Sequence, residues 1–86
     1  MSKQAEEVIA PIDVDHSWCG GTRREYAFKN GYGASVICSP YSYGGKRGLW
    51  ELAELYEGDL TGSEPVGFLT EDDVQKKLKE IKGRKA

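Results

Sequence analysis

Hydrophobic and polar residues alternate on both sides of Asn30 and Gly31, a pattern typical of two half-buried strands joined by a tight turn. The flanking segments are residues 23–28 and 32–38. A three-residue loop over residues 29–31 would place Gly31 in the left-handed conformation that this loop type requires. The loop would pair Phe28 with Tyr32, Tyr26 with Ala34 and Arg24 with Val36. We favour it over a two-residue turn at Asn30 and Gly31, which would shift the pairing by one residue and take the apolar side chains off their common face.

Residues 49–56 fit two patterns. Leu49, Leu52, Ala53 and Tyr56 have the spacing of a helical stripe, whereas strict alternation along the segment fits a strand less cleanly. Gly48 and Gly58 flank the segment, and a hairpin precedes it. These neighbours favour a strand with two partly buried faces.

The C-terminal part of the chain carries the clearest local signal. Thr70 is a candidate N-cap, and acidic residues 71–73 follow it at the positive end of a helix dipole. Val74, Leu78 and Ile81 then fall on one helical face, with lysines on the other. The pattern predicts a helix over residues 71–82 that ends at Gly83 and packs on a sheet. A polar loop at 57–63 and a short strand at 64–69, with Pro65 at its start, precede it.

Together these elements predict an α+β fold, a small antiparallel β-meander of three to four strands with one C-terminal α-helix packed on the sheet. A chain of 86 residues has room for one domain, which we place at residues 23–83. Residues 1–22 lack clear periodicity and are predicted to be flexible or loosely packed, with the first ten residues mobile. Residues 8–14 could add a strand only at a sheet edge, because Pro11 cannot donate to a ladder. Residues 84–86 are predicted to be a basic tail.

Composition narrows the class of protein. Twelve basic and 14 acidic residues leave a formal net charge of −2, which argues against duplex DNA or an anionic membrane as a bulk electrostatic partner. No apolar run approaches the ~20 residues of a membrane span, and the first residues lack the apolar segment of a signal peptide. We therefore expect a cytoplasmic protein that has no membrane partner. Its two cysteines are expected to be free thiols, with Cys38 a small core residue.

The candidates for catalysis and metal binding are few. His16 and Cys19 have an H-x-x-C spacing, with Asp13 and Asp15 before them and Cys38 later in the chain. A zinc site needs about four ligands, usually in two closely spaced pairs, and only one such pair is present. A Cys–His nucleophile pair also needs an orienting group and an oxyanion donor. The sequence predicts no catalytic residue, no metal site and no cofactor.

Two basic segments suggest one alternative function. Lys46 and Arg47 lie in the glycine-rich segment 44–48, whose backbone N–H groups could cradle a phosphate. The Walker A spacing is missing, however, and a hairpin loop with positive φ angles explains the glycines. Six of the twelve cations lie near the C-terminus, as expected of a solvated helix face; they are Lys76, Lys77, Lys79, Lys82, Arg84 and Lys85. The alternative is a nucleic-acid-binding module that uses both segments, with tyrosines for base stacking.

The aromatic residues divide into two groups. Six alternate with the predicted strands and are expected mostly in the core; they are Tyr26, Phe28, Tyr32, Trp50, Tyr56 and Phe68. Trp18, Tyr41 and Tyr43 lie in predicted loops. Because Trp and Tyr often carry interface energy, an exposed cluster of these three would be a protein-binding patch. With Lys46 and Arg47, they are the predicted partner-binding residues.

Four segments resemble a family of small phage and prophage proteins: YGASV at 32–36, YGG at 43–45, GLWELA at 48–53 and VGFLTEDDV at 66–74. The resemblance spans residues 24–82 of this chain. In that family the GLWELA segment follows a hairpin as a further strand, which supports a strand at 49–56. The family has no assigned function, so the resemblance implies a virus genome as the source and an accessory role. We therefore expect a non-enzymatic protein that binds a host or viral protein in the host cytoplasm.

Overall fold

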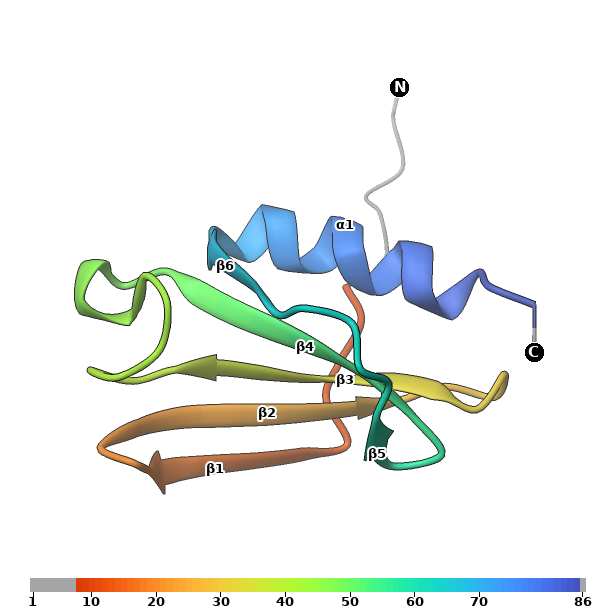
Figure 1. The fold of residues 1–86 in the computed structure, drawn as a ribbon, viewed down its shortest axis with the longest axis horizontal. Coiled ribbons are helices and arrows are strands. Elements are labelled where there is room, and N and C mark those ends of the chain that lie inside the picture. Colours follow the sequence, from red (N-terminus) through yellow and green to blue (C-terminus); the bar gives the residue numbers. More distant parts are fainter. Residues whose placement is uncertain (1–7, 86) are drawn as a thin grey trace.

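The computed structural model describes residues 8–85, which form an antiparallel sheet of six strands and one C-terminal α-helix. The strands are β1 (Asp13–Trp18), β2 (Gly21–Ala27), β3 (Tyr32–Cys38), β4 (Trp50–Tyr56), β5 (Asp59–Leu60) and β6 (Val66–Leu69). A 3-10 turn, η1 (Gly45–Arg47), lies between β3 and β4, and α1 (Glu71–Lys82) follows β6. Strands β1 to β4 form a meander, and β5 and β6 both pair with β4 (Figure 1). The predicted α+β class with a C-terminal helix is confirmed.

The sheet is larger than the predicted three to four strands, and that prediction was wrong. The missed strands are β1, inside the segment predicted to be loosely packed, and the two-residue β5, inside the predicted polar loop 57–63. β1 is an edge strand, and every residue from Asp13 to Ser17 is exposed. A strand exposed on both faces needs no apolar alternation, so the sequence carries no period signal for it.

The register of the central hairpin follows the three-residue loop. Arg24 pairs with Val36 and Tyr26 with Ala34, and the N–H of Phe28 donates to the carbonyl of Tyr32 at 2.8 Å. Gly31 has φ +90°, the left-handed conformation that the loop requires. The predicted pairing is confirmed, and it places Tyr26, Ala34 and Val36 on the buried face of the sheet.

The helix covers that buried face, packing on β3, β4 and β6. Its predicted bounds and its Thr70 cap are confirmed, and its buried residues are Val74, Leu78 and Ile81. These side chains join Tyr26, Val36 and Leu52 in the core. Leu52 lies in β4, so the prediction of a strand for residues 49–56 is confirmed as well. Within residues 8–85, no helix has both the length and the hydrophobicity needed to cross a membrane.

Long-range polar contacts hold the helix and the N-terminal segment to the sheet. Arg24 of β2 donates two hydrogen bonds to the carboxylate of Glu71, at 2.9 and 3.1 Å, and its guanidinium lies over the Trp50 ring at 4.1 Å. Ile9 exchanges two backbone hydrogen bonds with the side-chain amide of Gln75, at 2.9 and 3.1 Å. Residue 9 therefore packs on the helix. The mobility predicted for the first ten residues falls mainly on residues 1–7, which lie outside the described residues.

Candidate functional site: an aromatic loop surface

The segment between β3 and β4 is built from hydrogen bonds among its own residues. The backbone N–H of Ser42 and its hydroxyl both donate to the carbonyl of Ser39, at 3.1 and 3.0 Å. The N–H of Ser39 donates back to the Ser42 hydroxyl at 2.9 Å, and the N–H of Tyr41 donates to the Ser39 hydroxyl at 3.2 Å. Ser39 is itself buried. These contacts fix the backbone from which Tyr41 projects.

The glycine-rich part of this segment is a turn in which three of the backbone N–H groups are already hydrogen-bonded. Gly44 and Gly48 have φ +87° and +77°, which a residue with a Cβ adopts only at a cost. The N–H groups of Gly45, Arg47 and Gly48 donate to carbonyls within the segment, at 2.9 to 3.1 Å. A phosphate cradle needs such groups free. Turn geometry therefore accounts for the glycines.

Tyr41 and Tyr43 are exposed, 87% and 62% respectively. The backbone of Tyr43 is held on two sides, because its N–H donates to the Glu51 carboxylate at 2.8 Å and its carbonyl accepts from the N–H of Phe68 at 3.2 Å. The two tyrosines line one shallow depression together with Glu51 and residues 62–65. The structure therefore brings together two of the three aromatic residues predicted as a patch.

Phe68 extends this aromatic surface, although the sequence placed it among the core residues. It is 56% exposed and has φ +58°. Between the pairs Leu52–Val66 and Trp50–Leu69, β6 has one more residue than β4, so Phe68 lies in a β-bulge. A Cβ at Gly44 would lie 2.9 Å from the Phe68 Cα, which places Phe68 directly against the glycine-rich turn. The one sequence signal for the bulge is Gly67 inside a four-residue strand.

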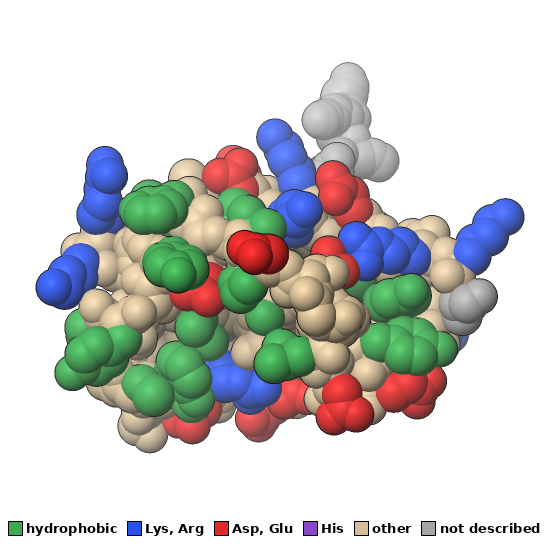
Figure 2. Space-filling view, in the orientation of Figure 1, with side chains coloured by type: hydrophobic (Ala, Val, Ile, Leu, Met, Phe, Trp, Pro, Cys, Tyr) green, Lys and Arg blue, Asp and Glu red, His purple; other side chains and the backbone are tan. Residues whose placement is uncertain are grey.

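Lys46 and Arg47 lie on the same turn and are exposed. Within the described chain neither has an ion-pair partner. Figure 2 shows basic side chains at the left rim of this face, beside a gathering of hydrophobic side chains. We call Tyr41, Tyr43, Phe68, Lys46 and Arg47 the aromatic loop surface.

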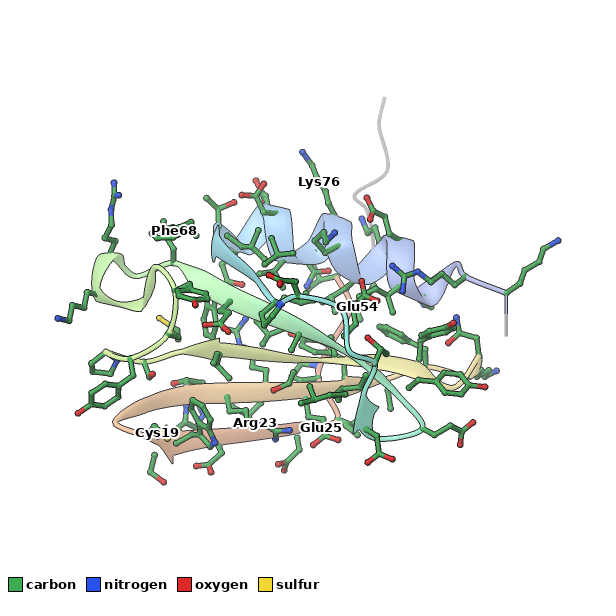
Figure 3. The ribbon with its side chains drawn as sticks, in the orientation of Figure 1. Cys19, Arg23, Glu25, Glu54, Phe68 and Lys76 are labelled. Carbon is green, nitrogen blue, oxygen red and sulfur yellow. The ribbon has the colours of Figure 1, made fainter. Side chains whose placement is uncertain are left out.

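Trp18 lies at the same end of the sheet, at the last position of β1, where it pairs with Gly21. It is half-buried, and it does not line the depression beside Tyr41 and Tyr43. Figure 3 shows Cys19, the residue after Trp18, and Phe68 at this same end of the molecule. Trp18 therefore belongs to the same end of the molecule as the aromatic loop surface, but not to its depression.

The remaining sequence candidates are His16, Cys19 and Cys38. His16 and Cys19 are exposed on β1 and in the turn after it. Cys38 is only half-buried, at the edge of the core. Among residues 8–85, no group of three or more His, Cys, Asp or Glu side chains is placed to hold a metal ion. Of the six predicted core aromatics, Tyr26 and Trp50 are buried, Phe28 and Tyr32 partly so, and Tyr56 and Phe68 are exposed. The prediction of a core position was wrong for the last two.

Comparison of the chain with protein-family models, with curated proteins and with solved structures found no match. The resemblance to small phage proteins therefore stays a prediction from the sequence. Function has to be argued from the geometry of this chain.

Proposed function

We propose that this chain is a non-enzymatic protein-interaction module whose aromatic loop surface binds a partner protein. The observation that carries the proposal is the exposure of Tyr41, Tyr43 and Phe68 on a hydrogen-bonded backbone. Tyrosine supplies a large contact area at low conformational cost, and interface hot spots are enriched in it. Lys46 and Arg47 lie beside these rings with no ion pair within residues 8–85, so their charge can steer the approach of a partner.

Following the phage resemblance, we place that partner among host or viral proteins of the host cytoplasm. The proposal assigns no role to a cofactor or a metal. It places the binding surface at the end of the sheet where the turn between β3 and β4 lies (Figure 1).

The arrangement of charge supports a protein partner over a nucleic acid. Lys46 and Arg47 follow β3 at one end of the long axis, whereas the C-terminal cations lie along α1, from Lys76 near its middle, and in the residues after it (Figures 1 and 3). The first turn of α1, which follows Phe68 after two residues, is acidic through Glu71, Asp72 and Asp73. A nucleic-acid backbone would need a continuous basic track. These two basic segments do not form one.

The test compares protein partners captured by three forms of the protein in cells that express it. Tyr41→Ser with Tyr43→Ser removes two exposed rings, and Ile12→Ser removes a comparably exposed apolar side chain, just before β1, as a matched control. We expect at least one protein to be captured by the wild type and by the control. The captured amount of that protein should fall about tenfold with the tyrosine double variant. Lys46→Glu with Arg47→Glu should change the rate of its association.

The proposal fails if every protein captured by the wild type is captured equally by the tyrosine double variant. The nucleic-acid alternative is tested separately, by gel shift at low salt. A shift that weakens steeply with salt and disappears with Lys46→Glu and Arg47→Glu would favour that alternative.

A further inference from the structure

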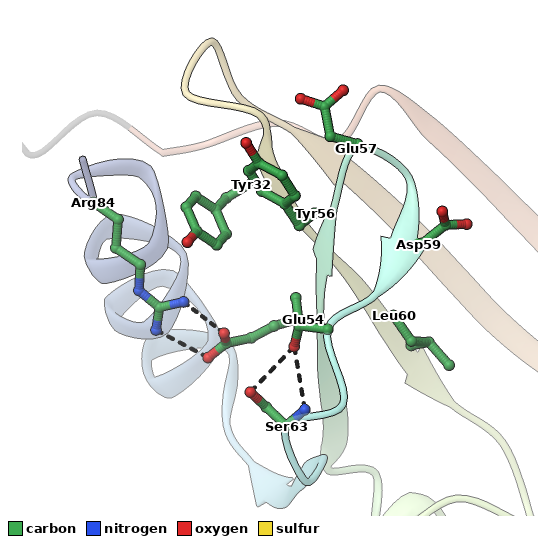
Figure 4. Close-up of a pocket in the computed structure, with 9 residues that line it drawn as sticks. Tyr32, Glu54, Tyr56, Glu57, Asp59, Leu60, Ser63 and Arg84 are labelled. Atoms are coloured by element: carbon green, nitrogen blue, oxygen red, sulfur yellow. Dashed lines mark hydrogen bonds and ion pairs between the residues drawn. The ribbon is translucent and has the colours of Figure 1, made fainter. Parts of the chain in front are cut away.

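A second site lies at the other end of the sheet, on the face that the helix covers. Tyr32 of β3 pairs with Tyr56 of β4, which pairs in turn with Asp59 of β5. Glu54 lies two residues before Tyr56 and so on the same face. With Glu57 and Arg84 these residues line an open pocket of about 570 Å³ (Figure 4). We call these six residues the tyrosine pocket.

A guanidinium group already occupies one side of this pocket. Arg84, two residues after α1, donates two hydrogen bonds to the carboxylate of Glu54, at 2.5 and 3.0 Å. Its guanidinium carbon lies 5.4 Å from the centroid of the Tyr32 ring, and Figure 4 shows it beside the Glu54 carboxylate. The Tyr32 and Tyr56 rings are tilted against each other at 4.8 Å. A carboxylate fork beside an aromatic wall is the arrangement that recognises arginine, and a lysine ammonium fits it less well.

Charge in the pocket is unbalanced. The carboxylates of Glu54, Glu57 and Asp59 line it, and among residues 8–85 Arg84 is the one cation in its lining. Glu57 and Asp59 are exposed, and within residues 8–85 no ion pair involves either of them. The side chain of Glu54 is only 16% exposed, and its hydrogen bonds from Arg84 hold the pKa of its carboxyl below the usual value. The pocket is therefore kept acidic and complementary to a further cation.

The Arg84 side chain can leave without releasing the end of the helix. The side-chain amide of Asn30 donates to the carbonyl of Arg84 at 2.8 Å, and also to those of Ile81 and Lys82. These bonds hold the backbone of residue 84 independently of its guanidinium. The side chain of Arg84 is 37% exposed, so water reaches the pair with Glu54 and exchange does not require unfolding.

We propose that the tyrosine pocket binds an arginine side chain from a segment of a partner protein, and that Arg84 is its built-in competitor. This site is separate from the aromatic loop surface and does not depend on the function proposed for it. Arg84 keeps Glu54 occupied in most molecules. The apparent affinity for an external arginine is therefore the intrinsic affinity multiplied by the fraction of molecules whose pocket is open. Removing the Arg84 side chain should therefore strengthen binding.

The test is a titration of purified protein with acetyl-Gly-Arg-Gly-amide, followed by NMR signals of Tyr32 and Tyr56. Arg84→Ala should bind this peptide about tenfold more tightly than the wild type. Lys85→Ala, which removes a neighbouring exposed cation from the same end of the chain, is the matched control and should bind like the wild type. The corresponding lysine peptide should bind more weakly, and the citrulline peptide, which keeps the shape without the charge, should not bind.

Glu54→Gln combined with Arg84→Ala should abolish binding, because it removes the carboxylate fork. Arg84→Gln, which keeps the length of the side chain, repeats the experiment if Arg84→Ala does not fold. The proposal is overturned if neither Arg84 variant binds more tightly than the wild type, or if citrulline binds as well as arginine. Free arginine amide binding as tightly as the peptide would assign the pocket to a small molecule and overturn the choice of a protein segment.

Discussion

Three non-glycine residues of the described chain adopt positive φ, and they do so for two different reasons. Cys19 and Glu57 each precede a glycine in a two-residue hairpin turn, where positive φ at both central positions matches the twist of the strands. Phe68 lies instead in the bulge of β6, against Tyr43 and Gly44. A side chain in this conformation costs about 1–2 kcal/mol. At Phe68 the same backbone conformation that carries this conformational cost also leaves the aromatic ring exposed.

At this scale we predict that Phe68→Gly is more stable than Phe68→Ala by about 1 kcal/mol, because only alanine keeps the left-handed strain. Both variants remove the same ring, so their difference reports the backbone alone. Urea unfolding of the two proteins measures it. Equal stability, or a more stable Phe68→Ala, would show that the backbone of residue 68 is unstrained.

At the scale of the element, the start of α1 combines a cap with a charge. The Thr70 hydroxyl accepts from the N–H of Asp73, and the Asp73 carboxylate accepts from the N–H of Thr70, both at 3.1 Å. Hydrogen bonding from Thr70, first of all from its backbone N–H, lowers the pKa of the Asp73 carboxyl below its ordinary value of 3.8. Hydrogen bonds from Arg84 likewise lower the pKa of Glu54 below 4.5. Both carboxylates therefore favour the folded state while they are ionised.

We expect the free energy of unfolding to fall as the pH drops from about 5 toward 2, because the unfolded chain takes up these protons first. Asp73→Ala should make this fall shallower, since it removes one of the groups whose pKa is lowered on folding. Asp72→Ala is the matched control, because it removes a carboxylate of the same helical turn and leaves the contacts with Thr70 intact. Urea midpoints between pH 7 and pH 2 measure the effect. An acid response that is identical in the wild type and in Asp73→Ala would contradict it.

At the scale of the whole molecule, the side chain of a single asparagine links the turn between β2 and β3 to the C-terminal end of α1. Asn30, in the turn between β2 and β3, donates to the carbonyls of Ile81, Lys82 and Arg84 and accepts from the N–H of Tyr32. The last carbonyls of a helix have no partner within the helix. Asn30 donates to two of them, those of Ile81 and Lys82, from more than fifty residues away in the sequence, and the carbonyl of Ile81 also accepts from the N–H of Arg84 at 3.2 Å.

We predict that Asn30→Ala lowers the free energy of unfolding by about 1–2 kcal/mol, the cost of removing this donor from the part-buried carbonyl of Arg84. Asn30→Asp keeps the acceptor for Tyr32 and loses the donor, and it faces a helix C-terminus that disfavours negative charge. It should be at least as destabilising as Asn30→Ala at neutral pH. Thermal unfolding compares the two, and an Asn30→Asp protein as stable as the wild type would disprove the role.

Much of the fold could be predicted because its signals are local. Alternation around Asn30 and Gly31 determines β2, β3 and their register, and the Thr70 cap with its apolar stripe determines the bounds of α1. Tyr41, Tyr43, Lys46 and Arg47 could be assigned to a loop because glycines surround them. β1 could not be predicted, because an edge strand exposed on both faces has no hydrophobic period to detect.

The sequence by itself therefore determined the class, the central meander and the helix, since these depend on residues within a few positions of one another. The tertiary structure alone decided what is exposed. A bulge against β4 turns Phe68 outward, and the pairing of β3, β4 and β5 with the residue after the helix gathers Tyr32, Tyr56 and Arg84 into a pocket. The physical reason is that exposure and pocket shape depend on contacts between residues far apart in the chain, for which a single sequence contains no repeating signal.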